Sequence, residues 1–225
     1  MKINIFAMTA LVALLAAPAG IAATTWVEGK HYTDLSGLSP STLAPGQKEV
    51  IEVFSYGCPA CAAFNSAAHK LQQGLPKGTT FTYVPAAFNP SEDWPMFQRA
   101  YLAARKLGVA DKAHDAMFDA VWKGGELAVS DATTGRLRSP LPTIEDAARF
   151  YSKQTGVKTA DFLAVANSFA LTKDIKEADE FIKKYRIDST PTIVVNRRYR
   201  TDVRSAGSYD SVVELVNWLV AKDGK

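Results

Sequence analysis

The succession of segments between residues 50 and 84 limits the fold more than any other part of the chain. Residues 50–56 are β-branched, aromatic and almost continuously apolar, as expected of a strand buried on both faces. An Ala-rich segment from Cys58 to Gln73 predicts a helix that Gly74 ends, and residues 79–84 alternate like a further strand. A strand, a helix and a strand in this order favour a right-handed crossover between two parallel strands.

The only two cysteines of the chain, Cys58 and Cys61, lie at the junction between the first of these strands and the helix. Pro59 fits the first turn of a helix, where its missing N–H costs nothing. A thiol at a helix N-terminus faces unpaired backbone N–H groups and the positive end of the helix dipole, and both favour the thiolate. Because the thiolate is the nucleophile, the Cys-x-x-Cys spacing predicts dithiol–disulfide chemistry.

Two other roles for the cysteine pair are weaker. A structural disulfide with this spacing closes a very short loop and so constrains the unfolded chain little. Two cysteines do not complete a tetrahedral zinc site. His31, His69 and His114 show no spacing typical of ligands, and each is expected to be an ordinary surface or partly buried residue. A copper-binding module or an exported chaperone stays open as a non-enzymatic alternative, although no Met or His lies adjacent to the pair. We therefore expect no metal and no cofactor.

The first 23 residues have the pattern of a secretory signal peptide. Met1-Lys2 precedes an apolar stretch that ends near residue 17, and small residues follow it. Cleavage is expected after Ala19, Ala22 or Ala23. An uncleaved N-terminal anchor is the alternative, although the apolar stretch is shorter than the roughly 20 residues that a membrane span needs. Export would place the cysteines in an oxidising compartment, where disulfides persist.

The middle of the chain, from about Ser91 to Arg186, has mostly helical periodicity. Lys123 to Pro142 is rich in Gly, Ser, Thr and Pro, which predicts a long loop between helices. We expect the aromatic residues of the helices to lie in the core. The positions that mark the successive helices are Trp94, Phe97, Tyr101 and Ala104; His114, Met117, Phe118 and Val121; a capping box at Thr143–Asp146; Phe162, Val165 and Phe169; and Ile175, Ala178, Phe181 and Ile182.

Strand patterns return near the end of the chain. Residues 192–195 and 199–203 flank Asn196-Arg197-Arg198, which is typical of a hairpin. A last helix is expected after a cap at Ser208 or Asp210, with Val212, Val213, Val216 and Leu219 facing inward. Near the other end, residues 26–32 predict a short strand.

This order of elements predicts an α/β fold with a helical block inserted into it. We expect residues 24–88 and 172–225 to form one α/β domain and residues 89–171 to form the inserted helical domain. Of the 225 residues, 47% are hydrophobic and 22% are charged, which is ordinary globular composition. The net charge of +3 is too small to imply a nucleic-acid partner.

With Cys-Pro-x-Cys after the buried strand, the layout resembles a thioredoxin fold. Together with a signal peptide and a helical insert, it is similar to the DsbA family of periplasmic thiol–disulfide oxidoreductases. The resemblance covers nearly the whole mature chain. The segments that carry it are residues 28–32, 52–61, 75–78 and 190–192, and Val195-Asn196.

The resemblance implies roles for individual residues. Cys58 resembles the exposed attacking thiol that forms the mixed disulfide with a substrate, and Cys61 resembles the buried resolving thiol. Pro191 resembles the cis-proline that faces the active site. A cis bond there would expose the backbone of Thr190, so that an extended substrate peptide could pair with it as an added strand. The residues between the cysteines, Pro59 and Ala60, are expected to contact the substrate too.

Glu52 is a further candidate for the site, because it interrupts a strand expected to be buried on both faces. A buried carboxyl has a raised pKa and could accept or relay the proton of Cys61. The family has an acidic residue at the matching position, which favours this interpretation. The alternative is a glutamate that faces solvent at the edge of the strand.

Two residues depart from the best-known members of the family. Those members have His where this chain has Ala60, and that His helps to stabilise the thiolate. Without it, the end of the helix must act alone on the thiolate, and we expect a pKa of Cys58 that is less depressed and a milder oxidant. The other departure is Thr190, which stands where those members usually have Val and which resembles disulfide isomerases and reductases.

The resemblance implies an oxidase that introduces disulfide bonds into exported proteins in the periplasm. Its partners would be unfolded exported proteins with reduced cysteines and a DsbB-type membrane quinone reductase that re-oxidises the site, and we expect a monomer. A disulfide isomerase or reductase is the alternative. Isomerases of the superfamily usually add an N-terminal dimerisation domain, and only about 25 residues lie between the cleavage region and the strand at residue 50.

Overall fold

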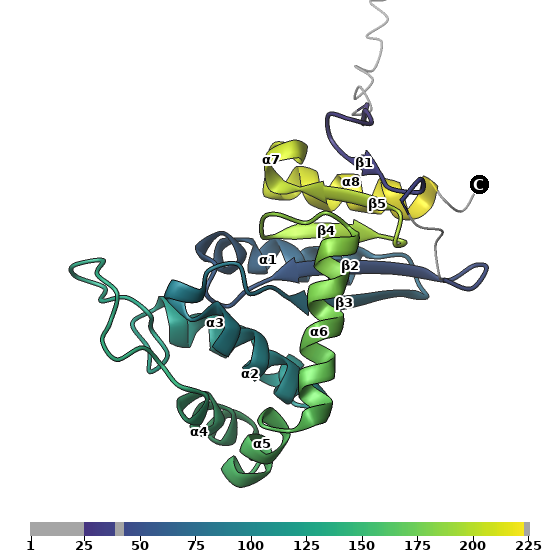
Figure 1. Ribbon diagram of the computed structural model, residues 1–225. Coiled ribbons are helices and arrows are strands. Elements are labelled where there is room, and N and C mark those ends of the chain that lie inside the picture. Colours follow the sequence, from purple (N-terminus) through teal and green to yellow (C-terminus); the bar gives the residue numbers. More distant parts are fainter. Residues whose placement is uncertain (1–24, 39–42, 223–225) are drawn as a thin grey trace, which may run out of the picture.

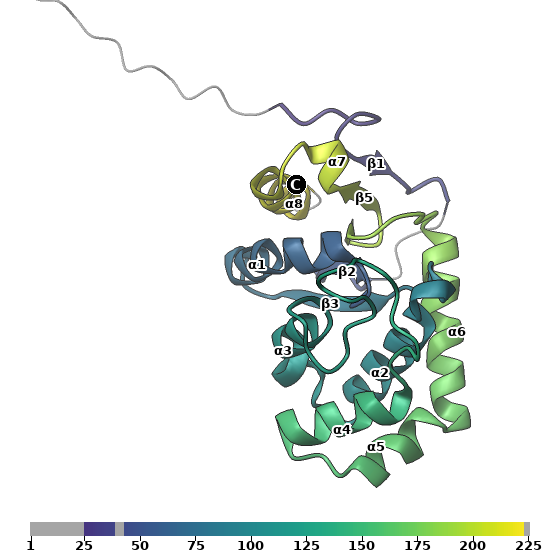
Figure 2. The same ribbon diagram turned by 90° about the vertical axis from the view of Figure 1, so that its left-hand side faces the viewer.

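The computed structural model describes residues 25–38 and 43–222, so the predicted signal peptide lies outside the described residues. The described chain has one mixed five-stranded sheet with helices on both faces. A group of further helices lies beyond one edge of the sheet (Figures 1 and 2).

The bounds of the elements follow the chain in this order. The strands are β1 (Thr33–Asp34), β2 (Lys48–Phe54), β3 (Thr79–Pro85), β4 (Thr192–Val195) and β5 (Tyr199–Asp202). The helices are α1 (Pro59–Gly74), a 3₁₀ turn η1 (Pro90–Glu92), α2 (Trp94–Lys106), α3 (Ala110–Trp122), α4 (Ile144–Thr155), α5 (Thr159–Ala166), α6 (Phe169–Lys184), α7 (Val203–Ala206) and α8 (Tyr209–Lys222).

The sheet has the strand order β1-β5-β4-β2-β3, which brings distant parts of the chain together. β2 pairs with β3 in parallel, as the sequence predicts, and with β4 in antiparallel orientation. The predicted hairpin is confirmed as the antiparallel pair of β4 and β5. Because β4 lies beside β2, the residues that follow Ser189 are placed next to those that precede Cys58.

Helices cover both faces of the sheet. On one face, α1 and α8 pack together on the side chains of Val50, Ile193 and Val195. On the other face, α6 covers Ile51 and Val53 (Figure 2). Alternate residues of β2 thus reach two separate hydrophobic clusters, which confirms a strand buried on both faces.

The helices α2 to α5 surround a third hydrophobic cluster that also contains Phe54, Cys58 and Cys61. The predicted capping box at the start of α4 is present, since the Thr143 side chain accepts from the Asp146 N–H and the Asp146 carboxylate accepts from the Thr143 N–H. The predicted division into a domain of residues 24–88 and 172–225 and an insert of residues 89–171 stays a prediction.

Two expectations about elements are wrong. Residues 26–32 form a turn rather than a strand, because the His31 N–H donates to the Val27 carbonyl and Gly29 adopts a positive φ of 78°. Only the next two residues join the sheet, as β1. Phe169 was expected in the core of the fourth helix but begins α6 with 87% of its surface exposed.

Within the described residues, no helix has both the length and the apolar character needed to cross a membrane.

Candidate active site

The end of β2 and the start of α1 place the two cysteines one helical turn apart. Cys58 is the N-cap of α1, and its extended backbone lets its Sγ accept from the Cys61 N–H at 3.4 Å. Pro59 occupies the first helical position, as expected. The Cys58 N–H donates to the Ser55 carbonyl at 3.1 Å, which closes the turn between strand and helix. Both cysteines are free thiols, so the structure represents the reduced site.

Both thiols are buried, which corrects the expectation of an exposed Cys58. Its side chain keeps 5% of its surface accessible, and Cys61 keeps none. Cys58 is the more accessible of the two, which agrees with its expected role as the attacking thiol, but the difference in accessibility is small. Cys58 is covered because a loop far along the chain lies against its sulfur.

That loop carries Thr190 and Pro191, whose peptide bond is cis, as the sequence analysis expects. The Cys58 thiol donates to the Thr190 carbonyl, with 3.5 Å between Sγ and O, across 132 residues of sequence. The Thr192 hydroxyl donates to the Ser189 carbonyl at 2.8 Å and so helps to fix the loop where β4 begins. The pairing of β4 with β2 thus brings Thr190 to the cysteines.

The pKa values of the two thiols are shifted in opposite directions. The pKa of Cys58 is lowered to about 6, mainly because the Cys61 thiol donates to its thiolate, and the Thr190 side chain and the N–H groups of Cys61 and Ala60 add to the effect. The pKa of Cys61 is raised, first by burial and then by its interaction with Cys58. At neutral pH the structure therefore favours one thiolate, on Cys58.

Glu52 lies beneath the pair, where the sequence analysis expects it. Only 2% of its surface is accessible, and its Oε2 has no hydrogen-bond partner among the described residues. Burial, and secondarily the negative charge of Cys58, raise the pKa of Glu52 to about 8. The negative charge of Glu52 in turn helps to raise the pKa of Cys61. The alternative of a solvent-facing glutamate is wrong.

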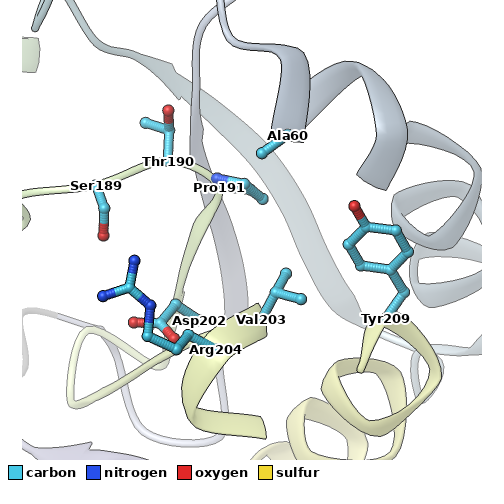
Figure 3. A pocket seen from close by; sticks show the side chains of 8 residues that line it. All are labelled: Ala60, Ser189, Thr190, Pro191, Asp202, Val203, Arg204 and Tyr209. Carbon is cyan, nitrogen blue, oxygen red and sulfur yellow. The ribbon is translucent and has the colours of Figure 1, made fainter. Parts of the chain in front are cut away.

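A pocket of about 280 Å³ opens where the start of α1 faces the loop at Thr190 and Pro191 (Figure 3). Ala60, Thr190 and Pro191 line one side of it, so two of the expected substrate contacts, Ala60 and Thr190, meet here beside the cis-proline. Pro59 is exposed at the start of α1 but does not line the pocket. The other lining residues are Ser189, Asp202, Val203, Arg204 and Tyr209.

Several residues of this region were not identified from the sequence. A side chain at Gly57 would meet the Trp94 indole at 2.6 Å, so Trp94 packs directly on the backbone before Cys58. Trp94 was identified only as a core position of its helix. The helical spacing predicts which face of its helix Trp94 occupies, but not which residue packs against that face.

His114 was expected to be an ordinary residue but is fully part of the aromatic core. Its Nδ1 and the Tyr56 hydroxyl share a hydrogen bond of 2.9 Å, and burial lowers the pKa of His114 to about 4. A neutral imidazole in this position supports the turn that precedes Cys58. Among the described residues, no group of three or more His, Cys, Asp or Glu side chains is arranged to hold a metal ion.

Comparison with known proteins gives a consistent result. A family model described as thioredoxin matches residues 44–215. The thiol:disulfide interchange protein DsbA of Pseudomonas syringae pv. tomato is 34% identical over 87% of this chain and 83% of its own length. DsbA of Pseudomonas aeruginosa is 32% identical over 96% and 95%. The crystal structure of DsbA from Xylella fastidiosa aligns with a TM-score of 0.75 at 32% identity, covering 88% of this chain and 97% of that one.

Proposed function

This chain belongs to the DsbA family of thiol:disulfide interchange proteins, which have a thioredoxin fold, and from this premise we propose that Cys58 and Cys61 are its redox-active pair. The protein is thus a thiol:disulfide oxidoreductase, and the proposal concerns which residues do the chemistry and in which direction. The observation that carries it is the lowered pKa of Cys58 beside a buried Cys61 whose pKa is raised.

The proposed reaction is the oxidation of a pair of substrate thiols. A substrate thiolate attacks Sγ of Cys58 in the Cys58–Cys61 disulfide, which forms a mixed disulfide and releases Cys61 as a thiolate. Because the pKa of Cys61 is raised, this thiolate takes up a proton. Glu52, with a pKa of about 8, carries that proton at neutral pH and is the proposed donor.

The second step releases the product. The other thiolate of the substrate attacks the substrate sulfur of the mixed disulfide, which leaves Cys58 as a thiolate. A low pKa makes Cys58 a good leaving group and stabilises the reduced protein, so the same property favours transfer of the disulfide to the substrate. The protein ends as a dithiol that has accepted two electrons.

The substrate is proposed to lie against the loop at Thr190 and Pro191. The Thr190 carbonyl is already within hydrogen-bonding distance of Cys58, so an extended peptide bound there would bring its cysteine to the reacting sulfur. Ala60 borders the same pocket, and Pro59 is exposed beside it. Unfolded exported proteins with reduced cysteines are the proposed substrates.

We place the protein in the periplasm, on the basis of the signal-peptide pattern in residues 1–23 and the DsbA relatives. Re-oxidation is assigned to a DsbB-type membrane quinone reductase. In that step the Cys58 thiolate attacks the partner's disulfide, and Glu52 as a carboxylate would receive the proton of Cys61. The monomeric state and the division into a domain of residues 24–88 and 172–225 and an insert of residues 89–171 belong to the same proposal.

Mixed-disulfide trapping tests the roles of the two cysteines. The Cys61→Ala variant is first activated with a small disulfide, which leaves a mixed disulfide on Cys58. A peptide with a single cysteine should then displace the small thiol and stay bound to Cys58, because neither Cys61 nor a second peptide thiol can release it. The matched Cys58→Ala variant should trap much less, because Cys61 is fully buried and its pKa is raised. Equal trapping by both variants would contradict the assignment.

Isomerase activity is the second candidate, because Thr190 resembles the residue of isomerases and reductases. A glutathione redox titration separates the candidates, since an oxidase needs a strongly oxidising disulfide. We expect refolding of a reduced substrate protein to be accelerated more than the rearrangement of one with scrambled disulfides. The opposite order would favour the isomerase.

A further inference from the structure

The far wall of the pocket in Figure 3 consists of residues that the chemistry of the cysteines does not use. Val203 and Arg204 lie in α7, and Tyr209 begins α8. The volume of about 280 Å³ lies below the roughly 300–1,000 Å³ of sites for drug-sized ligands. The pocket therefore suits one amino-acid side chain of a bound peptide.

Two side chains of this wall have hydrogen-bond donors with no acceptor in the part of the chain that the structure describes. Arg204 is exposed, and its guanidinium has no hydrogen bond or ion pair among the described residues. The Tyr209 ring is held edge-to-face on Phe64 with 5.7 Å between centroids. Its hydroxyl, which also has no partner in the described part of the chain, points toward Ala60 (Figure 3).

The acidic residue that lines the pocket, Asp202, has one of its two carboxylate oxygens engaged. Oδ1 of Asp202 accepts from the Ser205 N–H at 2.7 Å as the N-cap of α7. The Ser189 hydroxyl donates to the Asp188 carboxylate at 3.2 Å. Two groups of this wall without a partner among the described residues are a cation with five N–H donors and a phenol hydroxyl, and a carboxylate is their natural partner.

The position of the pocket decides which part of a substrate reaches it. Thr190 lines the pocket, and its carbonyl lies 3.5 Å from Sγ of Cys58. The pocket and the reacting sulfur therefore share this residue as a boundary. A side chain in the pocket must belong to a residue close to the substrate cysteine that reacts with Cys58. Ala60 leaves this entrance open because its side chain is only a methyl group.

We propose that Arg204, aided by the Tyr209 hydroxyl, is a specificity-determining residue that favours substrates with Asp or Glu beside the reacting cysteine. The proposal rests on the proposed function, since it concerns the substrates of the same site. Exposed ion pairs are weak, so the expected preference is about two- to fivefold in rate. It should decrease at high ionic strength, because salt screens exposed charges.

The test uses dithiol peptides that are identical except for Asp, Asn or Lys at one position beside the first cysteine, placed before it in one series and after it in another. The rate at which each peptide reduces the oxidised protein is measured for wild type, Arg204→Gln and Arg204→Glu. The neighbouring charge alters the thiolate fraction of a peptide. That effect cancels when the rates of two protein variants are compared for the same peptide.

In at least one series, we expect wild type to prefer the Asp peptide, Arg204→Gln to lose the preference, and Arg204→Glu to prefer the Lys peptide. The control is Lys158→Gln, which removes one positive charge from an exposed position at the start of α5 and should keep the wild-type preference. The pKa of Cys58 should be unchanged in Arg204→Gln, because Arg204 is not among the groups that shift it.

Three outcomes would overturn the proposal. The first is the same ratio of Asp-peptide rate to Lys-peptide rate in wild type and in Arg204→Glu, in both series. The second is a preference for Asp that survives in Arg204→Gln, and the third is a preference of wild type for Lys. The last would show that Asp202 controls the pocket. Failure of the oxidised protein to react with any peptide, the Asn peptide included, would instead contradict the proposed function.

Discussion

At the scale of single residues, Cys58 owes its lowered pKa to neighbours of three kinds. Two are local, namely the Cys61 thiol and the N–H groups of the first helical turn. The third is Thr190, which lies 132 residues away in sequence. From the sequence, the helix end is expected to act alone once His is absent between the cysteines. The structure corrects this, since the side chains of Cys61 and Thr190 contribute as well.

Ala60→His tests whether a basic side chain between the cysteines would lower the pKa of Cys58 further. A cationic or dipolar imidazole near the sulfur favours the thiolate, so the pKa should fall below about 6. The ultraviolet absorbance of the thiolate, followed against pH, measures it. A glutathione titration of the same variant should show a more oxidising disulfide.

Ala60→Gln is the matched control for that substitution, because it adds a polar side chain without a cation. It should change the pKa of Cys58 much less than His does. An unchanged or raised pKa in Ala60→His, or an equal fall in Ala60→Gln, would refute the argument.

At the scale of elements, Ser168 explains why the helix around Phe162 ends where it does. The Ser168 side chain accepts from the Leu171 N–H at 3.1 Å, which starts α6. The spacing of Phe162, Val165 and Phe169 fits a single helical face and predicts one helix. The cap interrupts that face, so the chain changes direction and Phe169 points to solvent.

Two phenylalanine substitutions test this difference. Phe162→Ala should lower the free energy of unfolding by about 3–5 kcal/mol, because it empties a fully buried site. Phe169→Ser should change it by less than about 0.5 kcal/mol, because the ring is exposed. Urea unfolding of both variants measures these free energies. A cost for Phe169→Ser comparable to that of Phe162→Ala would mean that this ring is buried in solution.

At the scale of the whole molecule, the sequence predicts the parts of the fold that have local patterns. β2, α1 and β3, the helical middle and the final hairpin follow from periodicity, caps and turn residues. Cys58, Cys61 and Glu52 are found because they stand out within their own segments. The far wall of the pocket is not found, because Arg204 and Tyr209 become neighbours of Ala60 only through packing. α7 escapes prediction because four residues are too few for a helical pattern.

Glu52 links the stability of the whole molecule to pH. Its pKa rises from 4.5 to about 8 on folding, so between these values the folded state binds more protons than the unfolded state. This group therefore lowers the stability progressively as pH rises from about 4.5 to about 8. Glu52→Gln cannot titrate, so its stability relative to wild type should be higher at pH 7 than at pH 4.5. The free energy of unfolding of the variant minus that of wild type should rise by roughly 2–4 kcal/mol between these two pH values.

Urea unfolding of the oxidised proteins across this pH range provides the measurement, since the disulfide removes thiol titration from the native state. The Cys58 charge is absent there, so burial, the larger cause of the raised pKa of Glu52, is the cause that is tested. Other ionisable groups contribute alike to both proteins, so the difference between them isolates Glu52. A difference that is constant with pH would show that the carboxyl has an ordinary pKa.

The antiparallel pairing of β2 with β4 also sets when the cysteines acquire their chemistry. Ribosomes add roughly 5–20 residues per second, and 132 residues separate Cys58 from Thr190. The cysteines are therefore made roughly 7–26 s before the residue that completes their surroundings. During that interval Cys58 lacks the Thr190 side chain that favours its thiolate, and β2 lacks one of its neighbours. The growing chain thus carries the pair without one of the neighbours that favour the Cys58 thiolate, and the site is completed only after Thr190 has been made.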